Sequence, residues 1–247
     1  IEAGEGPPLA LLHGLFGSAR NFGALQWRLA AHHRVLALDL RNHGESPHAE
    51  GMDYADLAAD VLETLGQRGA LPCGLLGHSM GGKVAMRAAL AAPAAVARLL
   101  VADIAPVVYR GAFAFYAQAM QALPLTPGLT RAGADAALRA AVPEARVRAF
   151  LLQNLRLTPT PAWRIGLAEI VRGLPQLLDW QAPAGAFYPG PTLFVAGALS
   201  DYIRPEHRPA IRALFPQARV VTLKGAGHWL HADNPVGFAA VAAEFFA

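Results

Sequence analysis

A serine set between glycines is the first feature of the chain that could do chemistry. Ser79 stands in the run GHSMG (77–81), between an apolar segment at 74–76 and a helical pattern at 80–91. The glycines leave room for a sharp turn from strand to helix that exposes the serine hydroxyl. The turn also puts that hydroxyl at a helix N-terminus, where free N–H groups and the helix dipole stabilise negative charge on oxygen. The pattern therefore predicts that Ser79 is a nucleophile.

A histidine near the C-terminus has the surroundings of a proton acceptor. His228 lies in the run GAGHW (225–229), after an apolar segment at 219–223. A histidine on such a flexible loop, at the edge where the strands of a sheet end, can reach the serine and act as general base and then as general acid. His231 is the rival, but it stands closer to the start of the following helix. The two histidines lack a third ligand and an H-E-x-x-H frame, so we expect no metal site.

A second loop is suited to stabilise the oxyanion that an attack by serine creates. The run HGLFGS (13–18) follows an apolar segment at 9–12. An oxyanion hole needs two converging N–H donors, one from the residue after the nucleophile and one from a loop after an earlier strand. We therefore expect the backbone N–H groups of Leu15 and Met80 to form it. His13 is expected to bond backbone in a structural turn, and a role for it in proton transfer stays open.

The carboxylate that would orient the histidine has two candidates. Chain order places it between Ser79 and His228, and both Asp103 and Asp201 meet that condition. Asp103 ends the apolar segment at 99–102, where it is either the triad acid or a hydrogen-bonding residue at a hinge. Asp201 is either the triad acid or a loop carboxylate near a predicted helix start.

Short apolar segments alternate with longer amphipathic stretches, which predicts a parallel β-sheet covered by helices. Each strand segment is almost wholly apolar, as strands buried on both faces require. The predicted strands are 9–12, 35–38, 74–76, 99–102, 192–196 and 219–223. The predicted helices are 19–31, 54–67, 80–91, 205–215 and 235–246. The last begins with Asp233 or Asn234 as N-cap and Pro235 at its first position.

The segment 104–190 interrupts this alternation. It contains no convincing strand, and its alanine-, leucine- and arginine-rich stretches are punctuated by prolines. We predict a helical cap at 104–190, inserted between the two parts of an α/β core, 1–103 and 191–247. The segment has eight arginines and four acidic residues. These arginines either attract anionic substrates or belong to ordinary solvated helix faces.

The composition excludes several classes of protein. Of 247 residues, 54% are apolar and 16% are charged, which is far from the composition of disordered chains. The net charge is +3, and the arginine and lysine residues are scattered, without the basic run typical of nucleic-acid binding. Charges or prolines break every long apolar stretch, so no membrane span is expected. Cys73 is expected to be a buried, inert thiol. The sequence starts at Ile1 without an initiator methionine or a basic and then apolar leader, so we expect that any targeting segment was removed or never existed. We also expect a cytoplasmic protein.

With these motifs in this order, the chain resembles the α/β-hydrolase fold superfamily, and within it the small carboxylesterase and acyl-thioesterase branch of bacteria with its mitochondrial relatives. The resemblance is carried by the segments 13–18, 39–46, 77–83, 101–107 and 225–233. It implies an α/β fold with a mostly parallel sheet, helices on both faces and a helical cap inserted after the sixth strand. The family's first two strands normally precede the 13–18 loop, and only 12 residues do so here. Those edge strands are absent, or the chain is part of a longer one.

The resemblance also bears on the acid of the triad. Asp103 lies in the run ADIAPV (102–107), which is similar to a branch whose acid follows this earlier strand. In many relatives the acid instead stands three residues after a glycine that ends a later strand. Here Gly197 is followed at that distance by Ser200, and Asp201 is one residue late. The resemblance therefore implies Asp103 as the acid, with Asp201 as the alternative.

Further residues near the motifs have expected roles. Three side chains are expected to contact the substrate: Phe16, His78 and Trp229. The aromatic residues at 113, 115 and 116 either line the same pocket or pack in the core. The turn 39–43, with its aspartate, arginine and histidine, is expected to be a salt-bridged loop anchor. The resemblance implies no metal and no organic cofactor.

Together these features predict a serine hydrolase that cleaves carboxylic esters or acyl thioesters through an acyl-enzyme intermediate. Its partner would be a small-molecule substrate and not a nucleic acid, and the residues indicate no oligomeric state. Alternatives on the same fold are a C–C bond hydrolase, a lyase, a peptidase, a cofactor-free haloperoxidase and a ligand receptor that does not turn over its ligand. Fold alone does not choose among them.

Overall fold

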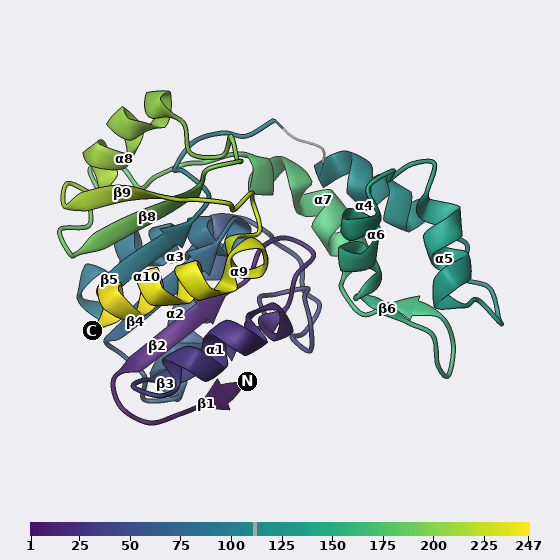
Figure 1. Ribbon diagram of the computed structural model, residues 1–247, viewed down its shortest axis with the longest axis horizontal. Helices are drawn as coiled ribbons and strands as arrows, with labels where there is room; N and C mark the ends of the chain where they lie inside the picture. The colour runs from purple at the N-terminus through teal and green to yellow at the C-terminus, as the bar shows by residue number, and fades with distance from the viewer. Residues whose placement is uncertain (111–112) are drawn as a thin grey trace.

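A seven-stranded β-sheet forms the body of the molecule (Figure 1). The computed structural model describes residues 1–110 and 113–247. The strand order is β1-β3-β2-β4-β5-β8-β9, in which β1 is antiparallel to β3 and the other neighbours are parallel. The prediction of a mostly parallel sheet is confirmed. The strands are β1 (Glu2–Ala3), β2 (Pro8–Leu12), β3 (Arg34–Leu38), β4 (Cys73–His78), β5 (Val96–Ala102), β8 (Thr192–Gly197) and β9 (Ala218–Leu223).

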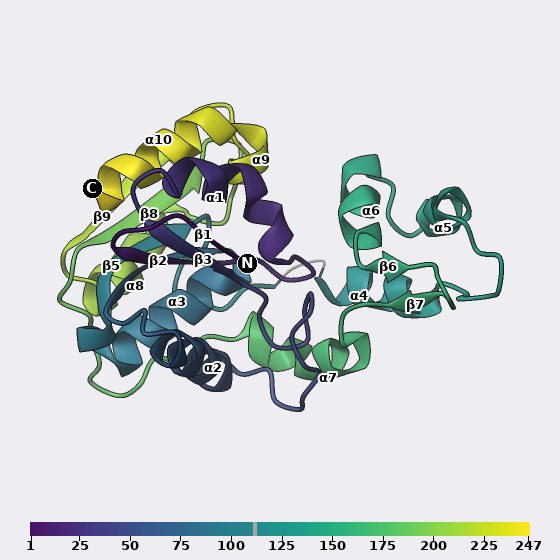
Figure 2. The same ribbon diagram turned by 90° about the horizontal axis from the view of Figure 1, so that it is seen from below.

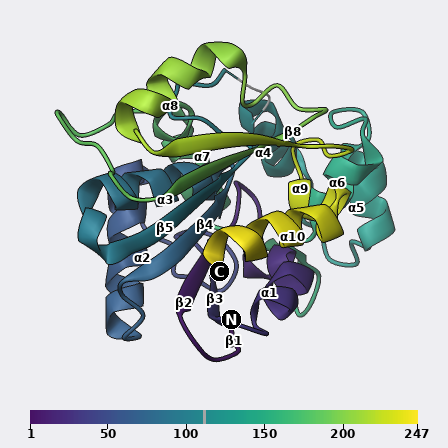
Figure 3. The same ribbon diagram turned by 60° about the vertical axis from the view of Figure 1, so that its left-hand side comes forward.

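Helices cover both faces of the sheet. They are α1 (Gly23–Leu29), α2 (Tyr54–Gln67), α3 (Met80–Ala91), α8 (Arg208–Leu214), the short α9 (Leu230–Asp233) and α10 (Pro235–Phe246). Successive side chains of a strand point to opposite faces. In β4, Leu75 therefore belongs to the apolar cluster that includes α2, α3 and α8, and Leu76 to the one that includes α1 and α10. Figures 2 and 3 show α1 and α10 on one side of the sheet and α2 and α3 on the other.

The predicted helix bounds are confirmed for α2, α3 and α10. The N-cap of α10 is Asn234, whose side chain accepts a hydrogen bond from the N–H of Gly237 at 2.9 Å. The predicted helices at 19–31 and 205–215 are each divided. The first becomes the 3-10 turn Ala19–Phe22 and α1, and the second becomes the 3-10 turn Pro205–His207 and α8.

The strand predicted at 219–223 exists as β9, but the expectation that both of its faces are buried is wrong. Leu223 is the buried residue of β9, and Val221 is 38% exposed. The reason is its position, because β9 lies at the edge of the sheet and has a neighbouring strand, β8, on one side only. An apolar composition does not distinguish an edge strand of this kind from a central one.

An insertion, residues 104–190, separates β5 from β8. Its segment 113–163 lies beyond one end of the sheet (Figures 1 and 2), whereas Tyr188, near its end, packs in the core and donates to the carbonyl of Val96 at 2.8 Å. Most of its regular elements are helices, but it also holds the antiparallel pair β6–β7, so the expectation of no strand is wrong. Strands of two residues are too short to leave a periodic signal. The elements are α4 (Phe113–Ala122), α5 (Arg131–Leu138), α6 (Ala145–Leu152), β6 (Leu155–Arg156), β7 (Ala162–Trp163) and α7 (Leu167–Leu178).

The insertion follows β5, the fifth strand along the chain, whereas the expectation places it after a sixth. The difference arises at the N-terminus of the described chain. In the family two strands normally precede the one that leads to the 13–18 loop, and the short β1 alone stands there among the described residues.

Two smaller expectations can be compared with the structure. Cys73 is 1% exposed, and burial raises the pKa of its thiol to about 12, which agrees with an inert core residue. In the parts of the chain that are described, 1–110 and 113–247, no helix combines the length and the hydropathy needed to cross a membrane.

Candidate active site

The ends of neighbouring strands bring the candidate catalytic residues together. Ser79 follows β4, Asp103 follows β5, and His228 lies in the loop between β9 and α9. Because β4, β5, β8 and β9 are parallel neighbours, their C-terminal ends meet at one edge of the sheet. Backbone hydrogen bonds continue past the strand ends: the N–H of Ser79 donates to Ala102 at 3.0 Å, and that of Asp103 to Val195 at 2.8 Å.

Ser79 occupies a backbone conformation that residues with a side chain rarely adopt. Its φ is 53° and its ψ −120°, and α3 begins at the next residue. Two glycines make this turn sterically possible. A Cβ on Gly77 would lie 2.2 Å from the carbonyl oxygen of Gly81, and a Cβ on Gly81 would lie 2.2 Å from that of Leu12. The predicted sharp turn is therefore present, and the close backbone contacts hold the strained serine in place.

A hydrogen-bonded chain joins the three candidate residues. The Ser79 hydroxyl lies 3.0 Å from His228 Nε2, and His228 Nδ1 lies 2.8 Å from Asp103 Oδ2. Because a carboxylate accepts, Nδ1 carries the imidazole proton and Nε2 is left free to accept the proton of the serine. This arrangement can convert a serine hydroxyl into a nucleophile.

The Asp103 carboxylate is fully buried and is held by three donors. The N–H of Gly197 donates to Oδ1 at 2.9 Å, while the Ser200 hydroxyl, at 2.5 Å, and His228 both donate to Oδ2. Sequence reasoning missed Ser200. The available signal was its position three residues after Gly197, where many relatives carry the acid itself.

The structure separates the two candidate acids. Asp201 is exposed, and no hydrogen bond joins it to His228 in the described chain. Asp103 is the one that contacts the imidazole. His231, the rival base, lies with its ring 4.9 Å from that of His78, and burial lowers its pKa to about 4.

The two expected oxyanion donors are available. Neither the N–H of Leu15 nor that of Met80 meets an acceptor among residues 1–110 and 113–247. The N–H of Phe16, by contrast, donates to His43 Nε2 at 3.1 Å. Met80 opens α3, so the helix dipole adds to the pull of its N–H on an oxyanion.

Two buried histidines hold the loop that carries Leu15. His13 donates from Nδ1 to the carbonyl of Gly14 at 2.8 Å and accepts the N–H of Leu40 at Nε2, at 3.0 Å. His43 donates from Nδ1 to the carbonyl of Arg41 at 2.9 Å. Burial lowers the pKa of His13 and lowers that of His43 to about 3. Both are therefore neutral near pH 7, which leaves one ring nitrogen of each as an acceptor.

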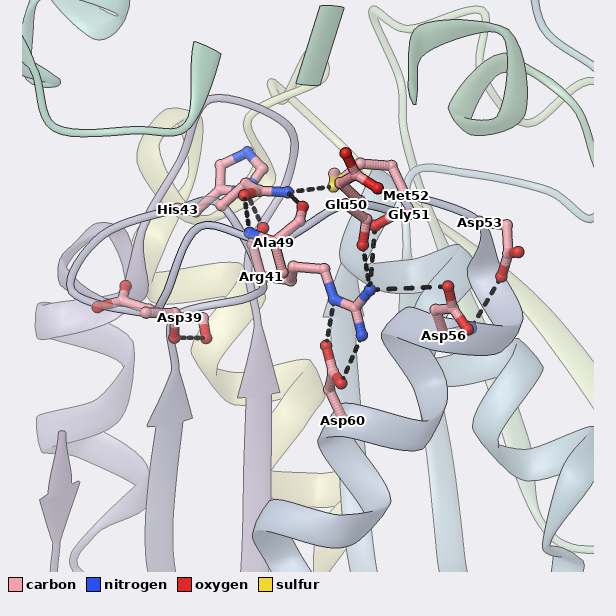
Figure 4. Close-up of polar contacts among 12 residues, drawn as sticks. Asp39, Arg41, His43, Ala49, Glu50, Gly51, Met52, Asp53, Asp56 and Asp60 are labelled. Atoms are coloured by element: carbon pink, nitrogen blue, oxygen red, sulfur yellow. Dashed lines mark hydrogen bonds and ion pairs between the residues drawn. The ribbon is translucent and has the colours of Figure 1, made fainter. Parts of the chain in front are cut away.

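The turn after β3 is anchored by ion pairs, as expected. The Arg41 guanidinium forms two hydrogen bonds of 2.7 Å with the carboxylate of Asp60, and it also reaches the carbonyls of Glu50 and Gly51 (Figure 4). Asp39 accepts the N–H of Ala19 at 2.7 Å, which ties this turn to the segment after the 13–18 loop.

A tyrosine that sequence reasoning did not single out lies against the imidazole. The ring of Tyr202 stacks on that of His228, with centroids 4.0 Å apart and 22° between the planes. The Tyr109 hydroxyl donates to the carbonyl of Tyr202 at 2.5 Å. A stacked aromatic ring fixes the orientation of the imidazole.

A cavity of about 200 Å³ opens at Ser79, lined mostly by apolar side chains. The three expected substrate contacts, Phe16, His78 and Trp229, all line it. From the insertion, Phe113 and Tyr116 line it too, whereas Phe115 does not and is 49% exposed. Phe115 lies on the opposite side of α4 from Phe113 and Tyr116. The sequence alone does not say which side of this helix faces the cavity.

The insertion contacts both loops that carry catalytic groups. Asn154 donates to the carbonyl of Phe16 at 2.8 Å. Arg146 pairs with Asp233, and the same Asp233 accepts the N–H of Gly227, next to His228, at 2.8 Å. The site is therefore built from the core and the insertion together.

No cluster of three or more His, Cys, Asp or Glu side chains that could hold a metal ion occurs in the described residues.

Comparison with known proteins places this geometry in a family. The model of the alpha/beta hydrolase family matches residues 9–241. The chain belongs to that family. The expected resemblance is thus confirmed.

Similar proteins share most of the length of this hydrolase. The sn-1-specific diacylglycerol lipase ABHD11 of Xenopus laevis is 46% identical over 94% of this chain and 77% of its own. The esterase YbfF of Escherichia coli is 36% identical over 92% of this chain and 88% of its own. A solved structure of a marine microorganism esterase is 35% identical and superimposes with a TM-score of 0.96, over 99% of this chain and 97% of that one.

The contact between Asp103 and His228 predicts different results for the two aspartates. Asp103→Asn should lower kcat by about 10⁴-fold, because an amide does not hold the imidazole in the required tautomer. Asp201→Asn, its matched control, should leave kcat unchanged. Ester hydrolysis by the two purified variants, with thermal unfolding to verify their folding, measures this. A fully active Asp103→Asn protein would contradict the assignment.

The buried histidines predict a loss of stability in mild acid. In the unfolded chain His43 has a pKa of 6.5 and binds a proton below that pH, whereas in the folded protein its pKa is about 3 and it stays neutral. The free energy of unfolding should therefore fall from pH 7 to pH 5, with at most about 1.4 kcal/mol per pH unit from this group. In His43→Gln, which keeps an acceptor, the slope should be shallower. Urea unfolding at several pH values measures it, and equal slopes would refute the role.

Proposed function

We propose that this protein is a serine hydrolase that cleaves carboxylic esters through an acyl-enzyme intermediate. The observation that carries the proposal is the hydrogen-bonded chain from Ser79 through His228 to the buried Asp103, next to a largely apolar cavity. Family membership and the names of its relatives, a lipase and two esterases, support the same reaction.

Acylation begins with Ser79. Its Oγ attacks the ester carbonyl while its proton passes to His228 Nε2, and Asp103 stabilises the imidazolium that forms. The carbonyl oxygen becomes an oxyanion that accepts the N–H groups of Leu15 and Met80. The tetrahedral intermediate then breaks at the bond to the leaving group, which takes the proton from Nε2 and departs as an alcohol.

Deacylation repeats these steps with water. His228 Nε2 removes a proton from a water molecule as that water attacks the acyl carbonyl. The same two N–H groups stabilise the second oxyanion, and the returning proton restores the Ser79 hydroxyl. Tyr202, stacked on the ring, and Ser200, bonded to the carboxylate, keep the imidazole aligned through both steps.

Acyl thioesters are a second substrate class for the same steps, since a thiolate leaves at least as readily as an alkoxide. Attraction of acyl-CoA by the insertion's arginines is small in this proposal, because most of those arginines have an acidic partner nearby. The paired residues are Arg139, Arg146, Arg148, Arg164 and Arg172.

The alternatives have less support from the site. A receptor that does not turn over its ligand has no need of an aligned nucleophile, base and acid with free oxyanion donors. A C–C hydrolase, a lyase, a peptidase or a haloperoxidase would use the same groups. Among the described residues no Asp, Glu, Lys or Arg lines the cavity, so no charged side chain there favours the substrates of these enzymes over an ester.

A fluorophosphonate probe tests the nucleophile. The folded protein should be labelled at Ser79, because the activated hydroxyl attacks phosphorus as it would an acyl carbonyl. Ser79→Ala should not be labelled, and His228→Ala should be labelled far more slowly. Peptide mapping by mass spectrometry locates the adduct. An unlabelled but folded wild-type protein would refute the proposal.

The ion pairs of the insertion predict how salt acts on the two substrate classes. Raising the ionic strength should lower kcat/KM for an acyl-CoA thioester no more than for a neutral p-nitrophenyl ester, because compensated charges attract a distant anion weakly. Initial rates for both substrates over a range of salt concentrations measure this. A steep loss confined to the CoA thioester would instead show that the arginines attract the anion.

A further inference from the structure

Ser79 lies between two cavities and not one. The larger, of about 200 Å³, is the apolar cavity described above. The smaller, of about 30 Å³, is lined by Met80, Lys83 and Ile104 among others. The two share a small set of lining residues, so they meet at the nucleophile: Leu15, Ser79, Phe113 and Tyr202.

The positions of the catalytic groups determine which cavity holds the acyl chain of an ester and which holds its leaving group. Once the carbonyl oxygen points to Leu15 and Met80, the leaving-group oxygen must face His228 Nε2, from which it takes a proton. Among the described residues His228 lines the larger cavity and not the smaller. The leaving group therefore belongs in the larger cavity, and the acyl chain extends into the smaller one.

We propose that the smaller cavity is an acyl subsite that admits short acyl groups, so that the preferred substrates are short-chain acyl esters of bulky, apolar alcohols. The inference rests on the proposed ester hydrolysis. The smaller cavity has about one seventh of the volume of the larger, about 30 Å³ against about 200 Å³, so it fits the shorter half of the ester, an acyl chain such as acetyl or propionyl.

Hydrogen bonds make the far wall of this subsite rigid. The Tyr54 hydroxyl donates to the carbonyl of Leu177 at 2.6 Å. Lys83, 1% exposed, donates to the carbonyl of Asp179 at 2.8 Å, and its Nζ lies 5.3 Å and 5.0 Å from the ring centroids of Tyr54 and Tyr109. A longer chain would have to break these buried contacts, which carry a cost that shorter chains avoid.

A series of p-nitrophenyl esters that differ in acyl length tests the proposal with the wild-type protein. The leaving group is constant, so kcat/KM reports on the acyl subsite. It should be highest for acetyl and propionyl and fall by at least about tenfold at hexanoyl, since a chain too long for a rigid pocket is strongly rejected. A second series of acetates, in which the leaving groups are all phenols and differ in size, should favour 1-naphthyl over phenyl acetate.

Variants of the wall sharpen the test. Leu178, half-buried in the smaller cavity, can be shortened with little risk to folding, and Leu178→Ala should move the preferred acyl length up by one or more carbons. Ile104→Val, a milder change, should shift it in the same direction. Val147→Ala enlarges the other cavity and should leave the order of acyl preference as in the wild type.

The outcomes separate this inference from the proposed function. Hydrolysis that improves toward octanoyl esters, or an acyl preference moved by Val147→Ala and not by Leu178→Ala, would overturn the subsite assignment and leave ester hydrolysis standing. Absence of turnover for every ester, together with absence of fluorophosphonate labelling, would overturn both.

Discussion

The buried carboxylate of Asp103 is the interaction on which the rest of the site depends. It has no exposed surface, and a buried carboxylate is tolerable only while donors surround it. Those donors come from three segments: Gly197 at the end of β8, Ser200 in the loop that follows, and His228 in the loop after β9. The strand order β4-β5-β8-β9 brings these segments together. The hydrogen-bonded chain from Ser79 to Asp103 therefore depends on the same strand order as the fold.

The residues that follow β4 and β5 lie in strained turns, and contacts from other parts of the structure hold the loops around them in place. Ser79 and Asp103, at the ends of adjacent strands, both have positive φ, at 53° and 51°. Buried neutral histidines hold the loop that carries Leu15, and the insertion ties down that loop through Asn154 and the His228 loop through Arg146 and Asp233. A substrate bound beneath the insertion thus meets groups that are already in place, which is the condition for electrostatic stabilisation of an oxyanion.

The sequence predicts the nucleophile, the base and the oxyanion donors because each depends on local signals: a glycine-rich turn after an apolar strand, or a histidine on a loop at a strand end. The choice between Asp103 and Asp201 depends on which loop approaches His228, and residue order does not contain that. Tyr202 acts by contact across strands, so its role appears only in three dimensions, and the one signal for Ser200 was its position three residues after Gly197. The pair β6–β7 and the two cavities follow from packing of the insertion, for which a single sequence offers no periodic pattern.

The most direct test of the central claim is to trap the covalent intermediate on Ser79. Rapid mixing of the protein with p-nitrophenyl acetate should release a burst of nitrophenolate close to one equivalent per chain. Mass spectrometry of peptides from an acid-quenched sample should place the acetyl group on Ser79. Steady turnover with an acetyl group on another residue, or with no acylated peptide and no burst, would contradict the account.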